Sequence, residues 1–594
     1  MSEPIRYRVS MSRPHSHLFE VEAWFPAQTE ELTVSLPVWT PGSYLVREYS
    51  RHVQEFTVVD AASKPVPFKR LDKRSYVISP QGRAVRLQYK VYANELTVRT
   101  SHLDGTHGYF NGATLFFYAE HLRNRAQHVH VDAPAGWRVT TALEQEDGVF
   151  IAPNYDELVD SPFECGTHTP LTFTAANVPH EIVLWGEPQL DEKKLVTDVG
   201  RIVETEAALL GGLPMKRYVF FIYATDKGRG GLEHKASTAL IYPRTGFASA
   251  KGWEDFLTLA AHEYFHLWNV KRIKPKALVP FDYAKENYTE LLWWFEGGTS
   301  YYDNLLVRRS SLMTAARYLT RFGESLTALH TTPGRKVLPL VDASFISWTK
   351  HYRPDENSPN TAISYYLKGE IVCALLDLHL RRATKDAKSL DDLLRVLWSR
   401  YGNESGVPEG GVEAAAEELG GTSLRDFFRD ALRGTGELSY DVFSHVGLEV
   451  KFRPRESNGD KGGTPPRKSA GKVEGWVGIV PRGGAISSVL EGSPAMAAGL
   501  YAEDEIIAVD GFKCDAGALV NRVEDKKPGE TVKVTLFRRD RLLEVPLTVA
   551  AKPADGAYLQ RVDGASEAQK TAYQAWLGAP WNELDSLNAA PPKV

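Results

Sequence analysis

The sequence predicts a multidomain protein of the α+β class. Its 594 residues exceed what one hydrophobic core usually organises, so several domains are expected. The first 175 residues alternate apolar and polar positions, whereas the central region carries apolar residues three or four positions apart. Hydrophobic residues make up 43% of the chain and charged residues 24%, which is the balance of an ordinary globular protein.

Residues 1–175 are predicted to form an N-terminal β-sandwich-like domain. Val85, Leu87 and Tyr89 alternate with polar residues, which is the pattern of a half-buried strand. The segment 18–25 behaves similarly, and turn sequences such as TPGSY and SPQGR separate the runs. We find no catalytic constellation within this domain and interpret it as an accessory domain.

Residues 176–453 are predicted to form a catalytic domain that combines a mixed sheet with a helical half. The strand-like run RYVFFIYAT opens the region, and the periodicity then changes to that of helices. The helical pattern is found near 253–270, 287–308, 311–326, 362–382 and 388–401.

The C-terminal part of the sequence divides into three further segments. Residues 454–473 are rich in Gly, Pro, Lys and Ser and are predicted to form a flexible linker. Residues 474–552 have the composition of a compact module, and residues 553–594 are an Ala- and Pro-rich tail predicted to form helical or loose packing on another domain.

Charge, cysteine content and hydropathy exclude several classes of function. The net charge of −5 offers no basic surface for nucleic acid, and three widely spaced cysteines indicate neither a disulfide framework nor a thiolate metal site. The N-terminus lacks the apolar core of a secretory signal, and no run approaches the length of a membrane span. We therefore expect a cytoplasmic protein without nucleic-acid or membrane partners.

The segment HEYFH places His262 and His266 four residues apart, with Glu263 directly after the first. On a helix these histidines share a face, so both imidazoles can bind one ion while Glu263 points beside it at a water molecule. Two imidazole ligands and a carboxylate that takes a proton from water are what a zinc hydrolase needs. A helix that simply packs two hydrogen-bonded histidines is the alternative.

A third ligand is predicted in the segment NYTELLWWFEGGTSYYDNLL. Glu296 follows Trp293, Trp294 and Phe295, and a carboxylate among such residues is costly to bury unless a positive charge compensates it. Zinc would provide that charge. Glu290 is the rival ligand, although its surroundings are less apolar.

These motifs resemble a known family. HEYFH followed by WNVKRIKP, and then LWWFEGGTSYY, is similar to the glycyl-aminopeptidase family of zinc metallopeptidases, a gluzincin group whose members often carry a C-terminal PDZ domain. The N-terminal segment LPVWTPGSYLVREYSRHV resembles that family as well. Twenty-nine residues (267–295) separate His266 from Glu296, which is longer than in the more distant large aminopeptidase superfamily.

The resemblance implies roles for further residues. The segment YLKG resembles the motif whose tyrosine donates a hydrogen bond to the oxyanion, which implies that role for Tyr366, with Tyr365 as the rival. The segment GGLEH resembles the substrate-binding strand, so Gly230, Gly231 and Glu233 are expected to bind substrate, and Glu233 to hold its free amino group. Leu232 and His234 depart from the family pattern at this strand.

The function predicted from these features is a zinc-dependent aminopeptidase with one zinc ion per chain. The resemblance implies peptide substrates with a free N-terminus and a preference for N-terminal glycine or alanine. The module at 474–552 resembles a PDZ domain, which either binds a C-terminal peptide or only packs on the catalytic domain. The alternatives are a zinc endopeptidase and a PDZ scaffold whose metal site is vestigial.

Overall fold

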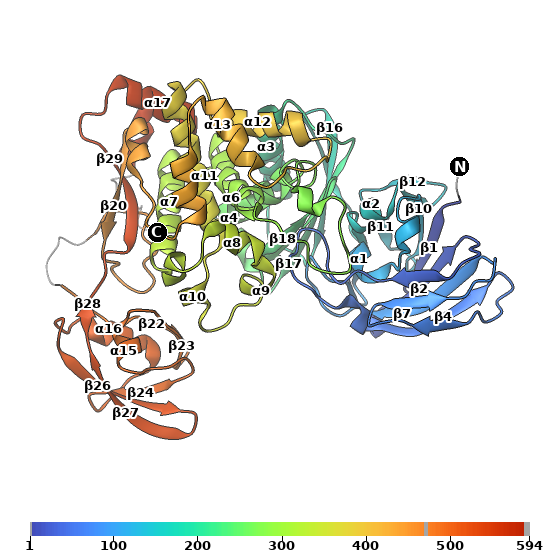
Figure 1. Ribbon diagram of the computed structural model, residues 1–594, viewed down its shortest axis with the longest axis horizontal. Coiled ribbons are helices and arrows are strands. Elements are labelled where there is room, and N and C mark those ends of the chain that lie inside the picture. Colours follow the sequence, from blue (N-terminus) through green and yellow to red (C-terminus); the bar gives the residue numbers. More distant parts are fainter. Residues whose placement is uncertain (1–2, 468–472, 587–594) are drawn as a thin grey trace. The chain divides into compact units, whose positions relative to one another are not determined.

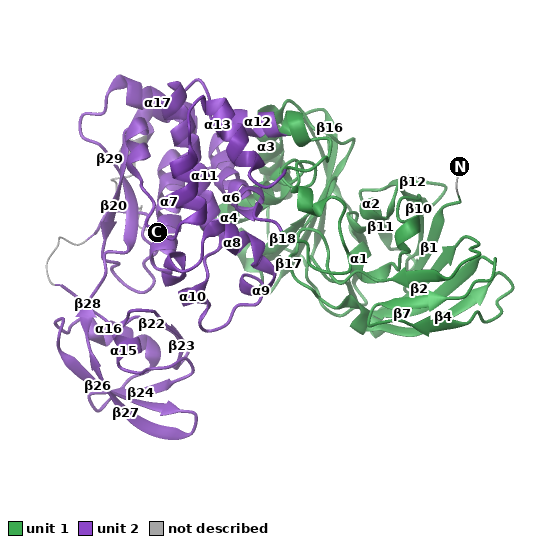
Figure 2. Ribbon diagram, viewed as in Figure 1, with its two compact units in different colours: residues 1–288, 398–407 green, residues 289–397, 408–594 purple. Residues whose placement is uncertain are grey.

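The computed structural model of the chain describes residues 3–467 and 473–586 (Figure 1). The chain forms two compact units, coloured separately in Figure 2. Unit 1 contains residues 1–288 and 398–407, and unit 2 contains residues 289–397 and 408–594. Within the described ranges, no helix combines the length and the apolar character needed to cross a bilayer.

Three β-sheets build the N-terminal part of unit 1. The largest contains, in spatial order, β12 (Glu144–Glu146), β13 (Val149–Ala152), β10 (Gln127–Asp132), β1 (Ile5–Ser10), β2 (Leu18–Phe25), β7 (Val85–Tyr92) and β4 (Val53–Asp60). A second contains β11 (Arg138–Thr140), β14 (Phe163–Gly166), β9 (His107–Phe110) and β8 (His102–Leu103). The third contains β3 (Leu32–Ser35), β6 (Ser75–Ile78) and β5 (Phe68–Arg70). Two short helices, α1 (Gly112–Leu115) and α2 (Tyr155–Val159), accompany them.

One hydrophobic core joins these sheets. Tyr7 of the first sheet, Phe110 of the second and Val34 of the third all belong to the same buried cluster. Strands β2 and β7 pair antiparallel and alternate buried with partly exposed residues, because successive side chains of a strand point to opposite faces. The predicted strands at 18–25 and 85–91 are therefore confirmed, and this part of the chain is β-rich as expected.

A five-stranded mixed sheet follows in unit 1. Its order is β15 (Leu171–Ala175), β16 (Val178–Trp185), β17 (Tyr218–Thr225), β19 (Ser237–Pro243) and β18 (Gly230–Glu233). Strands β16, β17 and β19 run parallel, and β18 pairs antiparallel with β19 at the sheet edge. Helix α4 (Ala250–Phe265) packs on β18 and β19 and also contacts α3 (Glu192–Leu210). This arrangement places the edge strand GGLE beside the helix that carries HEYFH.

The remaining chain is mainly helical. Its helices are α5 (Leu292–Phe295), α6 (Gly297–Arg309), α7 (Ala315–His330), α8 (Leu340–Phe345), α9 (Ser347–Lys350), α10 (Ser358–Thr361), α11 (Tyr365–Thr384), α12 (Leu390–Tyr401), α13 (Gly411–Gly420) and α14 (Arg425–Phe428). The predicted helical segments correspond to α4, α5 with α6, α7, α11 and α12. Figure 1 shows α7 and α11 lying alongside each other in this region, where they are in contact.

The predicted helix at 287–308 is interrupted at Glu296. Helix α5 ends at Phe295 and α6 begins at Gly297, so the interruption falls on the expected ligand itself. A side chain on Gly297 would lie 2.5 Å from Cα of Gly369, and a side chain on Gly369 would lie 2.5 Å from the carbonyl oxygen of Trp293. Glycine at both positions therefore lets α6 and α11 approach at backbone distance.

The final segments of unit 2 pair with each other. Strand β20 (Leu448–Arg453) forms an antiparallel ribbon with β29 (Gly556–Arg561), and α17 (Glu567–Leu577) follows. Part of the predicted linker, residues 468–472, and part of the predicted tail, residues 587–594, lie outside the described residues. In the described part of the linker, the amide of Gly463 donates to the carbonyl oxygen of Ala557 at 2.7 Å.

A compact β module lies between these two segments. It contains β21 (Gly475–Trp476), β22 (Ile479–Arg482), β23 (Ala485–Val489), α15 (Pro494–Ala497), β24 (Glu505–Val509), β25 (Phe512–Lys513), α16 (Ala516–Val523), β26 (Thr531–Arg538), β27 (Arg541–Thr548) and β28 (Ala550–Ala551). Its buried cluster, which includes Ile486, Leu519 and Leu536, is a hydrophobic core of its own. The predicted α+β multidomain fold is confirmed.

Burial of Glu370 on α11 makes the stability of this helical region depend on pH. The side chain is buried, and Ser325 on α7 donates a hydrogen bond to it at 2.9 Å. Burial, assisted by the nearby charge of Asp303, raises the pKa of Glu370 to about 8. Folding therefore favours the protonated carboxyl, so the folded state loses stability as the pH rises from the ordinary glutamate range toward 8.

Replacing Glu370 with glutamine should remove this pH dependence. Glutamine keeps the shape and can still accept the bond from Ser325, but it has no charge to bury. We expect the variant to come close to the wild type at pH 5 and to unfold at a higher temperature at pH 9, because the cost of burying the charge is fully present only above the folded-state pKa. Thermal unfolding followed by circular dichroism at the two pH values measures this. A melting difference that is the same at both pH values would contradict the assignment.

Candidate active site

Helix α4 presents His262 and His266 on one face. Nε2 of His262 lies 3.1 Å from Nε2 of His266, and Nδ1 of His266 lies 2.8 Å from the carbonyl oxygen of Asn269. Since that carbonyl accepts the ring proton at Nδ1, the lone pair of His266 is at Nε2. Two zinc-bound nitrogens in a tetrahedral site are about 3.4 Å apart, so the pair is close to the spacing of metal ligands.

Glu263 is buried between α4 and the edge strand β18. Its side chain is 5% exposed. A Cβ atom on Gly231 would lie 2.2 Å from Cδ of Glu263, so only glycine at this position leaves room for the carboxyl group. The predicted substrate-binding glycine Gly231 thus contacts the predicted base, whereas a Cβ on Gly230 would meet nothing nearer than Arg99 Nη1 at 3.8 Å.

Glu233 stands at the end of β18 and is also withdrawn from solvent. It is 3% exposed, and its Oε1 has no hydrogen-bond partner among the described residues. Gly42 of the TPGSY turn lies against it with φ of +88°, and a Cβ there would be 2.5 Å from Oε1. The N-terminal domain therefore reaches strand β18 through Gly42, a contact that the sequence did not reveal.

A buried charge network fixes the loop that follows α4 to the loop that follows β18. Asp160 forms an ion pair with Lys271, lies 3.3 Å from Nδ1 of His234 and accepts from the amide of Lys235 at 2.7 Å. Burial acts to raise the pKa of Asp160, but the charge of Lys271 and the contact with His234 hold it well below its usual range. The motif WNVKRIKP, through Lys271, thus anchors the end of α4 to the loop that follows Glu233.

Glu296 lies in unit 2 together with a group of aromatic residues. Glu296 is 2% exposed at the interruption between α5 and α6. Burial, followed by the charge of Glu296, raises the pKa of Tyr366 well above its ordinary value, and a side-chain hydrogen bond with Tyr352 acts in the same direction. Tyr366 therefore stays protonated and able to donate, and Tyr352, which the sequence did not single out, is its neighbour.

Tyr365 and Glu290, the alternatives to Tyr366 and Glu296, have different surroundings. Tyr365 is fully buried and stacks on Tyr366 with ring centroids 4.7 Å apart, which is the position of a packing residue. Glu290 is partly exposed, and its amide faces the carboxylate of Glu409 at 3.3 Å.

Three of the predicted residues form a candidate metal centre. Among the described residues, His262, His266 and Glu296 each offer one ligand atom, and these atoms lie within 4.8 Å of one another. A lone pair fixed at Nε2 of His266 and a buried carboxylate are the donors that zinc prefers. Glu233, Glu263 and His266 form a second group of the same span.

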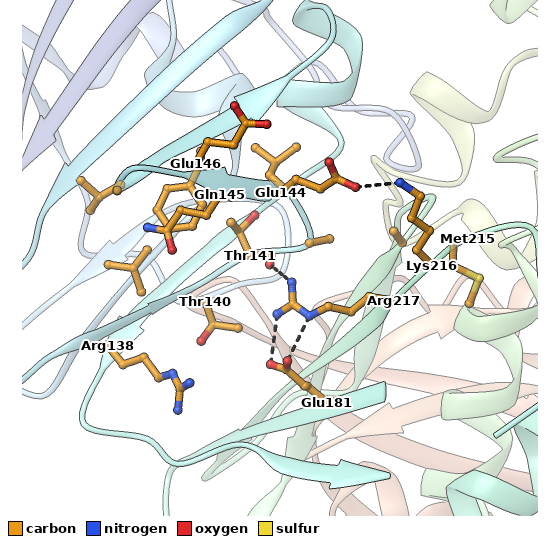
Figure 3. A pocket seen from close by; sticks show the side chains of 17 residues that line it. Arg138, Thr140, Thr141, Glu144, Gln145, Glu146, Glu181, Met215, Lys216 and Arg217 are labelled. Carbon is orange, nitrogen blue, oxygen red and sulfur yellow. Dashed lines mark hydrogen bonds and ion pairs between the residues drawn. The ribbon is translucent and has the colours of Figure 1, made fainter. Parts of the chain in front are cut away.

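A broad hollow of unit 1 is lined by residues other than the predicted site residues. It has a volume of about 920 Å³, and the residues that line it include Arg138, Glu144, Lys216 and Arg217. Figure 3 shows the guanidinium of Arg217 pointing at Glu181, with both nitrogen–oxygen distances at 3.0 Å. None of the predicted site residues is among the residues that line this hollow.

Comparison with known proteins assigns the chain to a family. The N-terminal domain model of peptidase M61 matches residues 6–167, the M61 glycyl aminopeptidase model matches residues 255–372, and a PDZ domain model matches residues 450–549. The crystal structure of an aminopeptidase N family protein from Idiomarina loihiensis is 32% identical, with a TM-score of 0.90, over 96% of this chain and 100% of that one. The chain belongs to the M61 glycyl aminopeptidase family. It is a metallopeptidase with an N-terminal β-rich domain and a C-terminal PDZ domain, as the sequence predicted.

Two other similarities either cover less of this chain or have a lower sequence identity and TM-score. A mutant M1 zinc metallopeptidase from Deinococcus radiodurans, bound to a Tyr-Ser-Ala substrate, is 12% identical with a TM-score of 0.47, over 74% of this chain and 95% of that one. A probable periplasmic serine endoprotease of the DegP-like type from Chlamydia muridarum is 37% identical over 89 residues, 15% of this chain. The chain spans 16% of the length of that curated relative.

The contact between Gly231 and Glu263 predicts a strong effect of one added methyl group. Gly231→Ala would push the carboxyl group of Glu263 away, and a misplacement of about 1 Å can cost about 10²-fold in rate. We expect kcat for an alanyl or glycyl anilide to fall by that factor while bound zinc, measured by mass spectrometry, is unchanged.

Gly230→Ala is the matched control for this prediction. It adds the same methyl group one residue earlier on the same strand, where the nearest atom is 3.8 Å away. It should keep most of the activity. Equal losses in the two variants would show that the strand, and not the contact with Glu263, is responsible.

Proposed function

We propose that this M61 enzyme is a zinc-dependent aminopeptidase that removes small N-terminal residues, glycine or alanine, from peptides. The observation that carries the proposal is the group formed by Glu233, Glu263 and His266, whose ligand atoms lie within 4.8 Å of one another. A carboxylate that can hold a free amine is thus close to the predicted base and to a predicted metal ligand. A scissile bond held next to Glu263 then lies one residue from the N-terminus.

His262, His266 and Glu296 would hold one zinc ion per chain. When bound, zinc supplies Lewis-acid chemistry that activates water and polarises the scissile carbonyl. Glu263 would accept the proton of the attacking water and pass it to the leaving amine, since it is adjacent in sequence to His262 and close to His266. Glu263 is buried, and the absence of a side chain at Gly231 leaves room for its carboxyl group.

Tyr366 would stabilise the oxyanion by donating a hydrogen bond from its hydroxyl group. The raised pKa of Tyr366 keeps the phenol protonated at neutral pH, which a donor requires. Tyr366 is partly exposed, whereas Tyr365 occupies a fully buried packing position, which supports Tyr366 over Tyr365.

Glu233 would hold the α-ammonium group of the substrate. Its carboxylate is buried, and Oε1 is without a hydrogen-bond partner among the residues described, so a bound ammonium group would satisfy an otherwise costly charge. Gly42 lies against the same carboxylate, since a Cβ at Gly42 would be 2.5 Å from Oε1 and 2.7 Å from Oε2 of Glu233. The preference for small N-terminal residues rests on the resemblance to the glycyl-aminopeptidase family.

The PDZ domain would bind the C-terminal segment of a peptide as an added strand. Strand β22 lies at an edge of its sheet, and α16 packs beside it. An edge strand next to a helix is the arrangement into which extended peptides insert by main-chain pairing. Val480 on β22 is 40% exposed.

The role of Glu263 is tested by Glu263→Gln. The substitution removes the base but no metal ligand, and general-base catalysis contributes about 10²–10⁴-fold, so kcat should fall by that factor with zinc retained. Zinc content and anilide hydrolysis are measured on the same preparation. Near-wild-type turnover in the zinc-loaded variant would rule out Glu263 as the base.

The exopeptidase assignment is tested by Glu233→Gln. Glutamine keeps the volume beside Gly42 but removes the charge, and an unpaired buried ammonium costs on the order of 2–5 kcal/mol. We expect kcat/KM for a free alanyl peptide to fall tens to thousands of fold.

An N-acetylated analogue of the same peptide is the control for this variant. It brings no charge, so its slow hydrolysis should be nearly unchanged, and the ratio of the two rates is the quantity to measure. If both substrates lose the same factor, Glu233 is structural and an endopeptidase becomes the better description.

A further inference from the structure

We propose that the protein carries a second divalent transition-metal site, formed by His102, Asp104 and His107. Each of these side chains offers one ligand atom, and the atoms lie within 4.8 Å of one another. The three residues belong to the hairpin of β8 and β9 in unit 1, within the sequence HLDGTH, and none of them takes part in the proposed peptidase chemistry. The site is therefore argued from its own contacts.

His107 has the hydrogen-bonding pattern of a metal-binding histidine. Its Nδ1 lies 3.0 Å from Oε1 of Glu164, and the other carboxyl oxygen of Glu164 accepts from the hydroxyl of Tyr223 at 3.0 Å. The ring is fully buried, and Nε2 has no hydrogen-bond partner among the described residues. A carboxylate on one ring nitrogen fixes the proton there and leaves the other nitrogen as the metal-binding lone pair.

Asp104 is held in place by the turn of the hairpin. Its Oδ1 accepts from the amide of Thr106 at 2.7 Å, from the Thr106 hydroxyl at 2.6 Å and from the amide of His107 at 3.1 Å. Three donors on one oxygen fix the orientation of the carboxylate. Oδ2 is directed instead at Nε2 of His102, at 3.2 Å.

The spacing of these atoms suits a small ion. Ligands about 2.0–2.1 Å from a tetrahedral zinc ion lie about 3.4 Å from one another, so the 3.2 Å between His102 Nε2 and Asp104 Oδ2 needs little change. The rings of His102 and His107 have centroids 5.0 Å apart. Two imidazoles and one carboxylate favour zinc and neighbouring late transition metals over magnesium or calcium.

A hollow adjoins this site at His107. Its volume is about 510 Å³, and His107, Glu164 and Trp185 are among the residues that line it. Trp185 stacks on the ring of His107 with centroids 4.2 Å apart, which prevents the imidazole from turning away. Three protein ligands leave a fourth tetrahedral position for water or for another ligand.

The experiment measures cobalt binding to the full-length chain after chelation, because four-coordinate Co²⁺ replaces zinc and has a visible absorption. The background is the double variant His262→Ala/His266→Ala, which lacks the proposed catalytic ligands. We expect it to bind about one equivalent of Co²⁺, and the wild type about two. Failure of the proposed catalytic site and failure of this one therefore give different stoichiometries.

Further variants in that background locate the ion. His107→Phe and His102→Phe should abolish the remaining equivalent, and Glu164→Gln, which keeps the shape of the supporting carboxyl, should weaken binding by about 10–100-fold. His168→Ala is the control, since His168 lines the same hollow but lies outside the cluster. Circular dichroism confirms that each variant is folded. A folded background variant that binds no Co²⁺, or one whose binding is unchanged by Glu164→Gln and His107→Phe, overturns the proposal.

Discussion

Burial of carboxylates is the constraint on which the active region depends. Glu233, Glu263 and Glu296 are 3%, 5% and 2% exposed, and a carboxylate removed from water is costly unless positive charge or donors compensate it. Asp160, another buried acid, is paired with Lys271. We propose one partner for each glutamate: a substrate ammonium group for Glu233, a water proton for Glu263 and a metal ion for Glu296.

Close approach at glycine is how the fold brings these carboxylates to their positions. Gly231 leaves room for Glu263, and Gly42 leaves room for Glu233. Gly297 and Gly369 allow α6 and α11 to meet at backbone distance, at the point where Glu296 interrupts the helix and close in sequence to Tyr366. A single added Cβ at any of these positions would overlap a neighbouring atom, so the glycines are part of the site although they carry no chemistry.

Local periodicity made much of the fold predictable. The alternation in β2 and β7 and the three-to-four spacing in α4, α7 and α11 follow from side-chain geometry within one element. Helix interruptions and the pairing of strands far apart in the chain were harder to predict from the sequence. The break at Glu296 depends on helix packing at Gly297, and the ribbon of β20 with β29 joins segments on either side of the PDZ module. The pairing of β20 with β29 is not encoded in a short window of sequence, whereas the pair Gly297-Gly298 makes a helix break conceivable.

The sequence by itself singled out the residues to which we assign the proposed peptidase chemistry, His262, His266 and Glu296 from their pattern and Tyr366 and Glu233 from a family resemblance. Residues four apart on a helix share a face, so the spacing in HEYFH was enough to pair His262 with His266. The apolar residues that precede Glu296 singled it out as the third predicted ligand. Only the tertiary structure decided that Gly42 lies against Glu233 and that Glu164 orients His107, because these contacts join strands and turns far apart in the chain. Spacing along one element is local, whereas contact between elements is settled by how they pack.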